Sequence, residues 1–284
     1  AAVDAMRSLI STVHFNGVVV IGEGEKDEAP MLYNGEHVGD GTGALCDVAV
    51  DPIDGTRLTA LGINNALAVL AVAERGTMFD PSAVFYMEKL VTGPEAADMV
   101  DLRLPVKQNL HLIAKAKGKK INQLNVMILE RDRHKPLVQE IRDAGARTRM
   151  LMDGDVAGGI AAAREGTDVD ALMGIGGTPE GIITACAVKT LGGVIQGRLW
   201  PTSDEEKQKA IDAGHDLDRV LSTNDLVTSD NCYFAATGIT DGDLVRGVRY
   251  KKDRVLTQSI VMRSKSGTIR MVDGEHQSHK WESY

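Results

Sequence analysis

The sequence of 284 residues lacks the features that define several large protein classes. Its three cysteines, Cys46, Cys186 and Cys232, are an odd number and form no Cys-x-x-Cys pair, so we expect no disulfide framework. No apolar run reaches the roughly 18–20 residues that a membrane-spanning helix needs, and no signal peptide is visible. We therefore predict a protein of the reducing cytoplasm that contacts no membrane, with Cys46 and Cys186 as buried thiols.

Positive charge is also scarce. Lys and Arg number 32 against 40 Asp and Glu, so the net charge is −8, whereas proteins that bind nucleic acids present basic stripes to the phosphate backbone. We therefore expect no nucleic-acid partner. An acidic pocket can still take a phosphorylated substrate, because bound divalent cations reverse its local charge.

Well-known catalytic motifs are missing as well. The sequence contains no Gly-x-Ser-x-Gly elbow, no lysine-containing phosphate loop and no His-Glu-x-x-His motif among its 7 histidines. A nucleophilic serine or cysteine mechanism therefore has no support. His134 follows two arginines and could reach a phosphate, although the pattern fits an exposed helix start equally well.

The sequence does contain alternating apolar runs and helical patterns. Strands are predicted at residues 17–22, 46–50, 66–73, 83–91, 124–130, 147–152, 171–174 and 194–198 and again after residue 231, and helices at 134–144, 156–163 and 179–191. This alternation predicts an α/β fold. A basic, polar stretch at 115–123 places a boundary between an N-terminal metal- and phosphate-binding half, residues 1–118, and a C-terminal sugar-binding half, residues 119–284.

The segment Asp51-Pro52-Ile53-Asp54-Gly55-Thr56 carries the strongest chemical signal. It places two carboxylates three residues apart where an apolar strand ends, with a proline that restricts the backbone between them. Gly55 allows a close turn that leaves Thr56 and nearby backbone N–H groups facing an anion. Oxygen ligands of this kind suit Mg²⁺ or Mn²⁺.

Three weaker signals also follow predicted strands. The acidic residues 23–28 (EGEKDE) are by themselves more typical of a solvated loop. Residues 174–181 (GIGGTPEG) precede a helix that Thr178 would cap, and this glycine-rich turn would let a phosphate approach the backbone but is also typical of any tight turn. Residues 153–155 (DGD) are equally compatible with an ordinary helix cap by Asp155.

These strand ends together predict one pocket in which carboxylates hold divalent cations and the cations hold a phosphate. Two ions roughly 3.5–4 Å apart stabilise both the attacking and the leaving oxygen of a phosphoryl transfer, and they lower the pKa of a bound water. The sequence thus favours metal-dependent phosphate chemistry.

The same segments and their neighbours resemble those of the bacterial class II fructose-1,6-bisphosphatases, within the lithium-sensitive, metal-dependent phosphatase superfamily. The segments are IGEGEKDEAPMLYNGEHVG, VDPIDGTRLTALGINNALAVLAVAERG, YMEKL, MDGDVA, GIGGTPEG and SDNCYFAATGITDGDL. The resemblance runs from residue 1 to about residue 272. It implies a sugar-phosphatase fold of alternating helix and sheet layers, an αβαβα sandwich, assembled as a homotetramer.

Matched position by position, the resemblance implies roles for three groups of residues. Thr56 would position or activate the attacking water, and Glu25 and Asp27 would orient it. The implied ligands for Mg²⁺ or Mn²⁺ are Glu23, Asp51, the carbonyl group of Ile53, Asp54 and Glu180. The implied substrate contacts are Asp54, Gly55, Thr56, Tyr86, Arg131, Arg133, Asp153, Gly154, Asp155 and Gly177, with the arginines on the phosphate that does not react and residues 153–155 on sugar hydroxyls.

The implied activity is hydrolysis of the 1-phosphate of fructose 1,6-bisphosphate to fructose 6-phosphate and inorganic phosphate, in gluconeogenesis. A broader enzyme that also accepts sedoheptulose 1,7-bisphosphate stays open, because the two sugars differ by one hydroxymethylene unit. A catalytically silent protein that binds metal and sugar phosphate is a further alternative. Family members carry a segment with a metal-binding aspartate before the helix at which this sequence begins, and we expect that segment to be disordered rather than missing.

Overall fold

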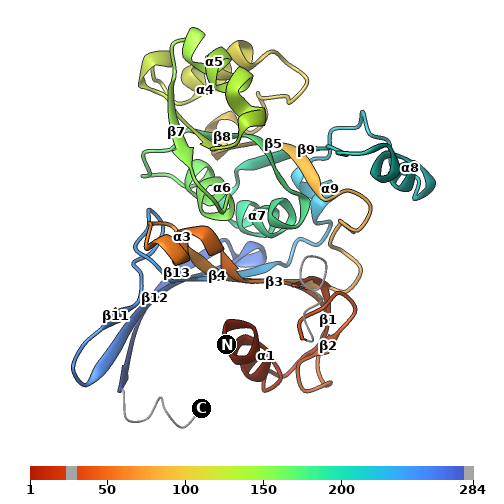
Figure 1. Ribbon diagram of the computed structural model, residues 1–284, viewed down its shortest axis with the longest axis vertical. Helices are drawn as coiled ribbons and strands as arrows, with labels where there is room; N and C mark the ends of the chain where they lie inside the picture. Colours follow the sequence, from red (N-terminus) through yellow and green to blue (C-terminus); the bar gives the residue numbers. More distant parts are fainter. Residues whose placement is uncertain (24–30, 278–284) are drawn as a thin grey trace.

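Two β-sheets form the frame of the protein (Figure 1), which a computed structural model describes at residues 1–23 and 31–277. In spatial order the larger sheet contains β11 (Arg249–Tyr250), β12 (Arg254–Arg263), β10 (Tyr233–Gly238), β4 (Leu67–Glu74), β3 (Leu45–Asp54), β1 (Asn16–Ile21) and β2 (His37–Val38), and β13 (Thr268–Gln277) also pairs with β12. The smaller sheet contains β7 (Arg147–Leu151), β6 (Asn125–Leu129), β8 (Ala171–Gly177), β5 (Tyr86–Thr92) and β9 (Val194–Leu199).

Helices form three layers around these sheets (Figure 1). The outer faces are covered by α1 (Ala2–Ile10) on the larger sheet and by α4 (Val106–Ala116) and α5 (Lys135–Asp143) on the smaller one, while α6 (Val156–Ala163) and α7 (Thr178–Leu191) lie between the sheets. The remaining helices are α3 (Thr56–Leu61), α8 (Asp204–Asp212), α9 (Thr223–Leu226) and the 3₁₀ turns η1 (Pro94–Ala96), η2 (Ile121–Gln123), η3 (Asp132–His134) and η4 (Ser264–Ser266). The layers run helix, sheet, helix, sheet, helix, which confirms the expected layered α/β fold.

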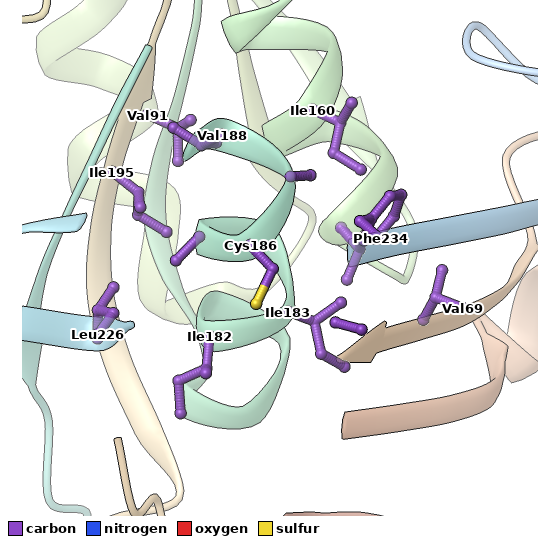
Figure 2. Close-up of a cluster of buried hydrophobic side chains, with 14 of the residues drawn as sticks. Val69, Val91, Ile160, Ile182, Ile183, Cys186, Val188, Ile195, Leu226 and Phe234 are labelled. Carbon is purple, nitrogen blue, oxygen red and sulfur yellow. The ribbon is translucent and has the colours of Figure 1, made fainter. Parts of the chain in front are cut away.

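The central core surrounds α7, which packs against both sheets (Figure 2). Its Ile183 and Cys186 are almost fully buried, and Figure 2 shows Val69 of the larger sheet on one side of the helix and Ile195 of the smaller sheet on the other. A helix that is apolar on all sides must be covered on all sides, so α7 takes the middle layer. This packing holds the first turn of α7, which includes Glu180, between the two sheets.

Most predicted elements are present, with ends shifted by a few residues. The helix predicted at 156–163 matches α6 at both ends, whereas β8 continues beyond residue 174 to Gly177 because every one of its residues is buried. The smaller sheet takes β5 from the proposed N-terminal half and its other strands from the C-terminal half, and the division after residue 118 stays a prediction.

The cysteines and the helices bear on two further expectations. Cys186 and Cys232 are buried free thiols, but Cys46 is only partly buried, because it lies beside the exposed Leu45 at the start of β3. The predicted burial of Cys46 is therefore wrong. In the described part of the chain, none of the helices has the length and apolar character needed to cross a membrane.

Candidate active site

A cavity of about 240 Å³ lies where strands from both sheets end, against the first turn of α7. Every predicted site residue that the structure describes lines this cavity. These residues are Glu23, Asp51, Ile53, Asp54, Gly55, Thr56, Tyr86, Arg131, Arg133, Asp153, Gly154, Asp155, Gly177 and Glu180. The predicted residues Glu25 and Asp27 lie outside the described part of the chain.

A β-bulge in β3 brings Asp51 and Asp54 to the same side of the larger sheet. Asp51 lies opposite Val69 and Asp54 opposite Leu67, so 54 − 51 = 3 steps on β3 match 69 − 67 = 2 steps on β4. Residues directly opposite each other in an antiparallel pair share a face, and Val69 and Leu67 are two residues apart on one face. The extra residue therefore turns both carboxylates toward the cavity.

The backbone around this bulge differs from the prediction. The strand does not end at Asp51 but continues to Asp54, because Pro52 interrupts the ladder without ending it. The Ile53 N–H donates to Asp51 Oδ1 at 3.0 Å, which fixes the carboxylate beside the bulge. Gly55 follows with φ of 84° and starts α3, so the predicted close turn before Thr56 is present.

Asp54 is the most deeply buried acid of the cavity, at 2% exposure. Its Oδ2 atom is buried and has no hydrogen-bond partner among the residues that the structure describes. Burial raises the pKa of Asp54 well above its usual range, and the charges of Asp51, Asp155, Glu180 and Asp153 raise it further. Repulsion among several carboxylates in one enclosed space is what a bound cation relieves.

The glycines of residues 174–181 make room for carboxylates. A β-carbon at Gly176 would lie 2.0 Å from Asp155 Oδ2, and one at Gly177 would lie 1.7 Å from Glu180 Oε2. From the sequence we expected these glycines to let a phosphate approach the backbone, but the groups that lie against Gly176 and Gly177 are the carboxylates of Asp155 and Glu180. Gly154 acts similarly on the other side, since a β-carbon there would lie 3.1 Å from both carboxylate oxygens of Asp54.

Neither of the two side-chain helix caps that the sequence suggested, by Thr178 and by Asp155, is present. Gly177, not Thr178, is the N-cap of α7, and the buried Thr178 hydroxyl has no hydrogen-bond partner among the described residues. Asp155 does occupy the N-cap of α6, but its side chain makes no capping bond there. Its Oδ2 instead accepts from Lys89 Nζ at 2.7 Å. Asp155 is therefore not an ordinary cap.

The arginines lie on the wall of the cavity that the smaller sheet provides. Arg131 donates to Asp153 Oδ1 at 3.0 Å and to the Met152 carbonyl at 2.6 Å. Arg133 lies over the ring of Tyr86, with its guanidinium carbon 4.7 Å from the ring centroid. These contacts fix two cationic groups beside the acidic cluster.

His134 is buried rather than part of an exposed helix start, at 1% exposure. Its Nδ1 lies 2.7 Å from the Leu129 carbonyl oxygen, and its Nε2 accepts from the Ile175 N–H at 2.7 Å. The ring thus bridges β6 and β8 beyond their short ladder at residues 126–127 and 171–172. It supports the strand ends and does not line the cavity.

The donor set fits a hard divalent cation. Glu23, Asp51, Asp54 and Glu180 all offer carboxylate oxygens to one cavity, and the buried Asp54 Oδ2 is the atom with most to gain from a cation. Across residues 1–23 and 31–277, however, no three His, Cys, Asp or Glu side chains form a group that could hold a metal ion.

The sequence of the chain also matches known proteins over nearly its whole length. A family model described as bacterial fructose-1,6-bisphosphatase, glpX-encoded, matches residues 1–276. The chain belongs to this family. It is 45% identical to the fructose-1,6-bisphosphatase class 2 of Haemophilus influenzae and 43% identical to the fructose-1,6-bisphosphatase 1 class 2 of Escherichia coli K12, in each case over 97% of this chain and 86% of the relative.

Sequence analysis of this fructose-1,6-bisphosphatase family member missed several residues of the site. Phe85 and Leu129 also line the cavity, and Lys89 lies behind it as the partner of Asp155. Period-two alternation along β5 places Lys89 on the same face as the buried Met87, but a lysine in a strand gives no local sign that it is buried or which residue pairs with it.

Proposed function

We propose that the protein hydrolyses the 1-phosphate of fructose 1,6-bisphosphate to fructose 6-phosphate and inorganic phosphate, as a metal-dependent step of gluconeogenesis. The observation that carries this proposal is the single cavity in which six acidic side chains and two arginines from separate strand ends meet. The names of the relatives, which are fructose-1,6-bisphosphatases, support the choice of substrate.

The acidic end of the cavity suits the phosphate that reacts. Glu23, Asp51, the Ile53 carbonyl, Asp54 and Glu180 are the residues that would hold Mg²⁺ or Mn²⁺. When bound, such ions stabilise negative charge on the transferring phosphoryl group and lower the pKa of a coordinated water.

Thr56 is the proposed partner of the attacking water. Its position in the cavity, directly after the turn at Gly55, supports this role. Its hydroxyl would accept a hydrogen bond from the water and pass a proton toward a carboxylate within reach. The water oxygen forms a bond to phosphorus, the bond from phosphorus to the sugar oxygen breaks, and that oxygen takes up a proton.

The other end of the cavity suits the sugar and the second phosphate. Arg133 and Arg131 offer planar guanidinium groups, which match the geometry of phosphate oxygens. Asp153 and Asp155 offer acceptors for sugar hydroxyls, and Tyr86 holds Arg133 in place through the stacked contact. In a bisphosphorylated sugar, the reacting phosphate would thereby meet the cations that the acids hold, and the second phosphate would meet the arginines.

The test is steady-state release of phosphate from fructose 1,6-bisphosphate in Mn²⁺ buffer by Thr56→Ala. We expect a strong fall in kcat with little change in KM, because the contact acts on the attacking water. Thr228→Ala, at an exposed loop position, is the matched control and should behave like the wild type. An unchanged kcat would remove Thr56 from the mechanism.

Two comparisons test the alternatives. Values of kcat/KM for sedoheptulose 1,7-bisphosphate close to those for fructose 1,6-bisphosphate would favour the broader bisphosphatase. Binding of either sugar without turnover, with Mg²⁺ and with Mn²⁺, would favour a catalytically silent binding protein.

We also propose that the protein assembles as a homotetramer. In the described part of the chain, β13 pairs with β12 alone, so its other edge is open. Ile269, Met271 and Val272 on this strand are exposed, and an open edge with apolar side chains favours contact with a further chain. The cytoplasmic location stays a prediction from the cysteine pattern.

A further inference from the structure

A buried lysine lies behind the candidate active site. Lys89 on β5 is 2% exposed and Asp155 is 5% exposed, and Lys89 Nζ lies 2.7 Å from Asp155 Oδ2. Lysine is among the residues that are rarely buried, because its charge loses hydration there unless a partner compensates it. Asp155 supplies that partner and also lines the cavity.

The surroundings of this ion pair leave no space for larger residues. A β-carbon at Gly176 would lie 2.0 Å from Asp155 Oδ2 and 3.0 Å from Lys89 Nζ. A β-carbon at Gly181, on the first turns of α7, would lie 3.3 Å from Lys89 Cε. The pair is thus enclosed by backbone from β8 and α7, and the lysine has little freedom to point elsewhere.

Asp155 and Asp54 share one cavity but have opposite surroundings. The charge of Asp155 is compensated by Lys89, whereas Asp54 is surrounded by the charges of other acids and its Oδ2 has no partner among the described residues. Two carboxyl groups placed in such different environments serve different roles. Asp54 suits a cation, and Asp155 has its countercharge already.

We propose that Lys89 is a positioning and specificity residue, which reserves Asp155 for a sugar hydroxyl and keeps it out of the set of metal ligands. The bond to Lys89 occupies Oδ2, while Oδ1 makes no hydrogen bond within residues 1–23 and 31–277. Oδ1 is therefore the acceptor for a donor in the cavity, and an aspartate already paired with a lysine has little to gain from a second cation. This inference rests on the proposed function, because it assigns the sugar hydroxyl to Asp155 and the metal ion to Asp54.

The first test compares Lys89→Met with the wild type in two measurements. We expect KM for fructose 1,6-bisphosphate to rise about tenfold, more than kcat falls, because a charged hydrogen bond to a hydroxyl is lost when Asp155 is no longer held. We also expect Mn²⁺, followed by electron paramagnetic resonance without substrate, to bind more tightly or in greater number, because Asp155 becomes a free carboxylate. Lys89→Arg should restore part of the wild-type behaviour in both.

Lys119→Met is the matched control. Lys119 also pairs with a buried aspartate, Asp170, at 2.6 Å, but that pair lies at the opposite end of β8 from the cavity. We expect this variant to keep the wild-type KM and Mn²⁺ binding. If both lysine variants change these quantities alike, the effect is one of general stability and the proposal fails.

A double-mutant cycle guards against misfolding of the single variant. Removing one partner of a buried pair leaves the other uncompensated, whereas Lys89→Met with Asp155→Asn removes both charges. If Lys89 acts only through Asp155, the double variant and Asp155→Asn alone should show the same KM. A further rise in KM in the double variant would show that Lys89 acts on the substrate independently, against the proposal.

The inference and the proposed function fail in distinguishable ways. A wild-type protein that releases no phosphate from fructose 1,6-bisphosphate would overturn the function. A wild-type protein that does so, beside a Lys89→Met variant with unchanged KM and unchanged Mn²⁺ binding, would overturn the role of Lys89 alone.

Discussion

Gly177 lies so close to Glu180 that a β-carbon on residue 177 would be 1.7 Å from the Glu180 Oε2 atom. Gly177 ends β8 and caps α7, and Glu180 lies in the first turn of that helix. The carboxylate therefore folds back over the glycine at the point where the helix begins. Its position in the cavity depends on the absence of a side chain three residues earlier.

Gly177→Ala should weaken metal binding by displacing Glu180. We expect the Mn²⁺ concentration for half-maximal activity to rise at least about tenfold, as it does when the support of a metal ligand is lost. Gly159→Ala is the control, because its β-carbon would lie 2.7 Å from the Thr184 methyl group, between α6 and α7. Both variants should lose thermal stability, but an equal shift in the Mn²⁺ requirement would mean that Gly177 has no special link to the metal.

Asp54→Asn should stabilise the metal-free protein while abolishing activity. The substitution removes a buried charge that burial and four neighbouring acids disfavour. The melting temperature in EDTA should rise, by about 2–4 °C for each kcal/mol of relief in a chain of this size. Asp47→Asn on the same strand should do the reverse, because buried Asp47 accepts the N–H groups of Thr77 and Met78. A lower melting temperature for Asp54→Asn would contradict this account.

The buried ring of His134 should make the protein less stable in mild acid. Burial lowers the pKa of His134 below its ordinary value of 6.5, so the folded protein holds the neutral ring. The free energy of unfolding should be highest above pH 6.5 and fall with decreasing pH, by at most about 1.4 kcal/mol per pH unit for this one group. Denaturant titrations from about pH 8 to about pH 5 would measure it.

His134→Gln is the comparison for that measurement. Glutamine can donate to the Leu129 carbonyl or accept from the Ile175 N–H without titrating. We expect this variant to be less stable at neutral pH but less sensitive to acid. An identical pH dependence in the two proteins would place the titrating group elsewhere.

The exposed side chains of β13 should hold the proposed tetramer together. Ile269 and Met271 are two residues apart and therefore share one face of the strand. Replacing both by Glu should shift the sedimentation coefficient toward smaller species. Ile211→Glu, at an exposed position on α8, should leave assembly unchanged. Wild-type sedimentation as a monomer would remove the basis of this prediction.

Sequence reasoning succeeded where the signal is local. Residues 51–56 and 174–181, parts of which line the cavity, were noticed because a strand that ends in acids or glycines before a helix is visible within a few positions. It failed where the partner is distant. The inward lysine at residue 89 and the bridging ring of His134 look like ordinary strand and helix-start residues until their neighbours are known.

The sequence by itself determined the family, the α/β class and most of the residues that line the candidate site, because periodicity, turn chemistry and motifs depend on neighbours along the chain. Only the tertiary structure decided how those residues act on one another. The pairing of β3 with β4 turns Asp51 and Asp54 to one side, and the contact of Lys89 with Asp155 joins residues 66 positions apart. Such register and burial arise when distant segments pack together, and no local pattern contains them.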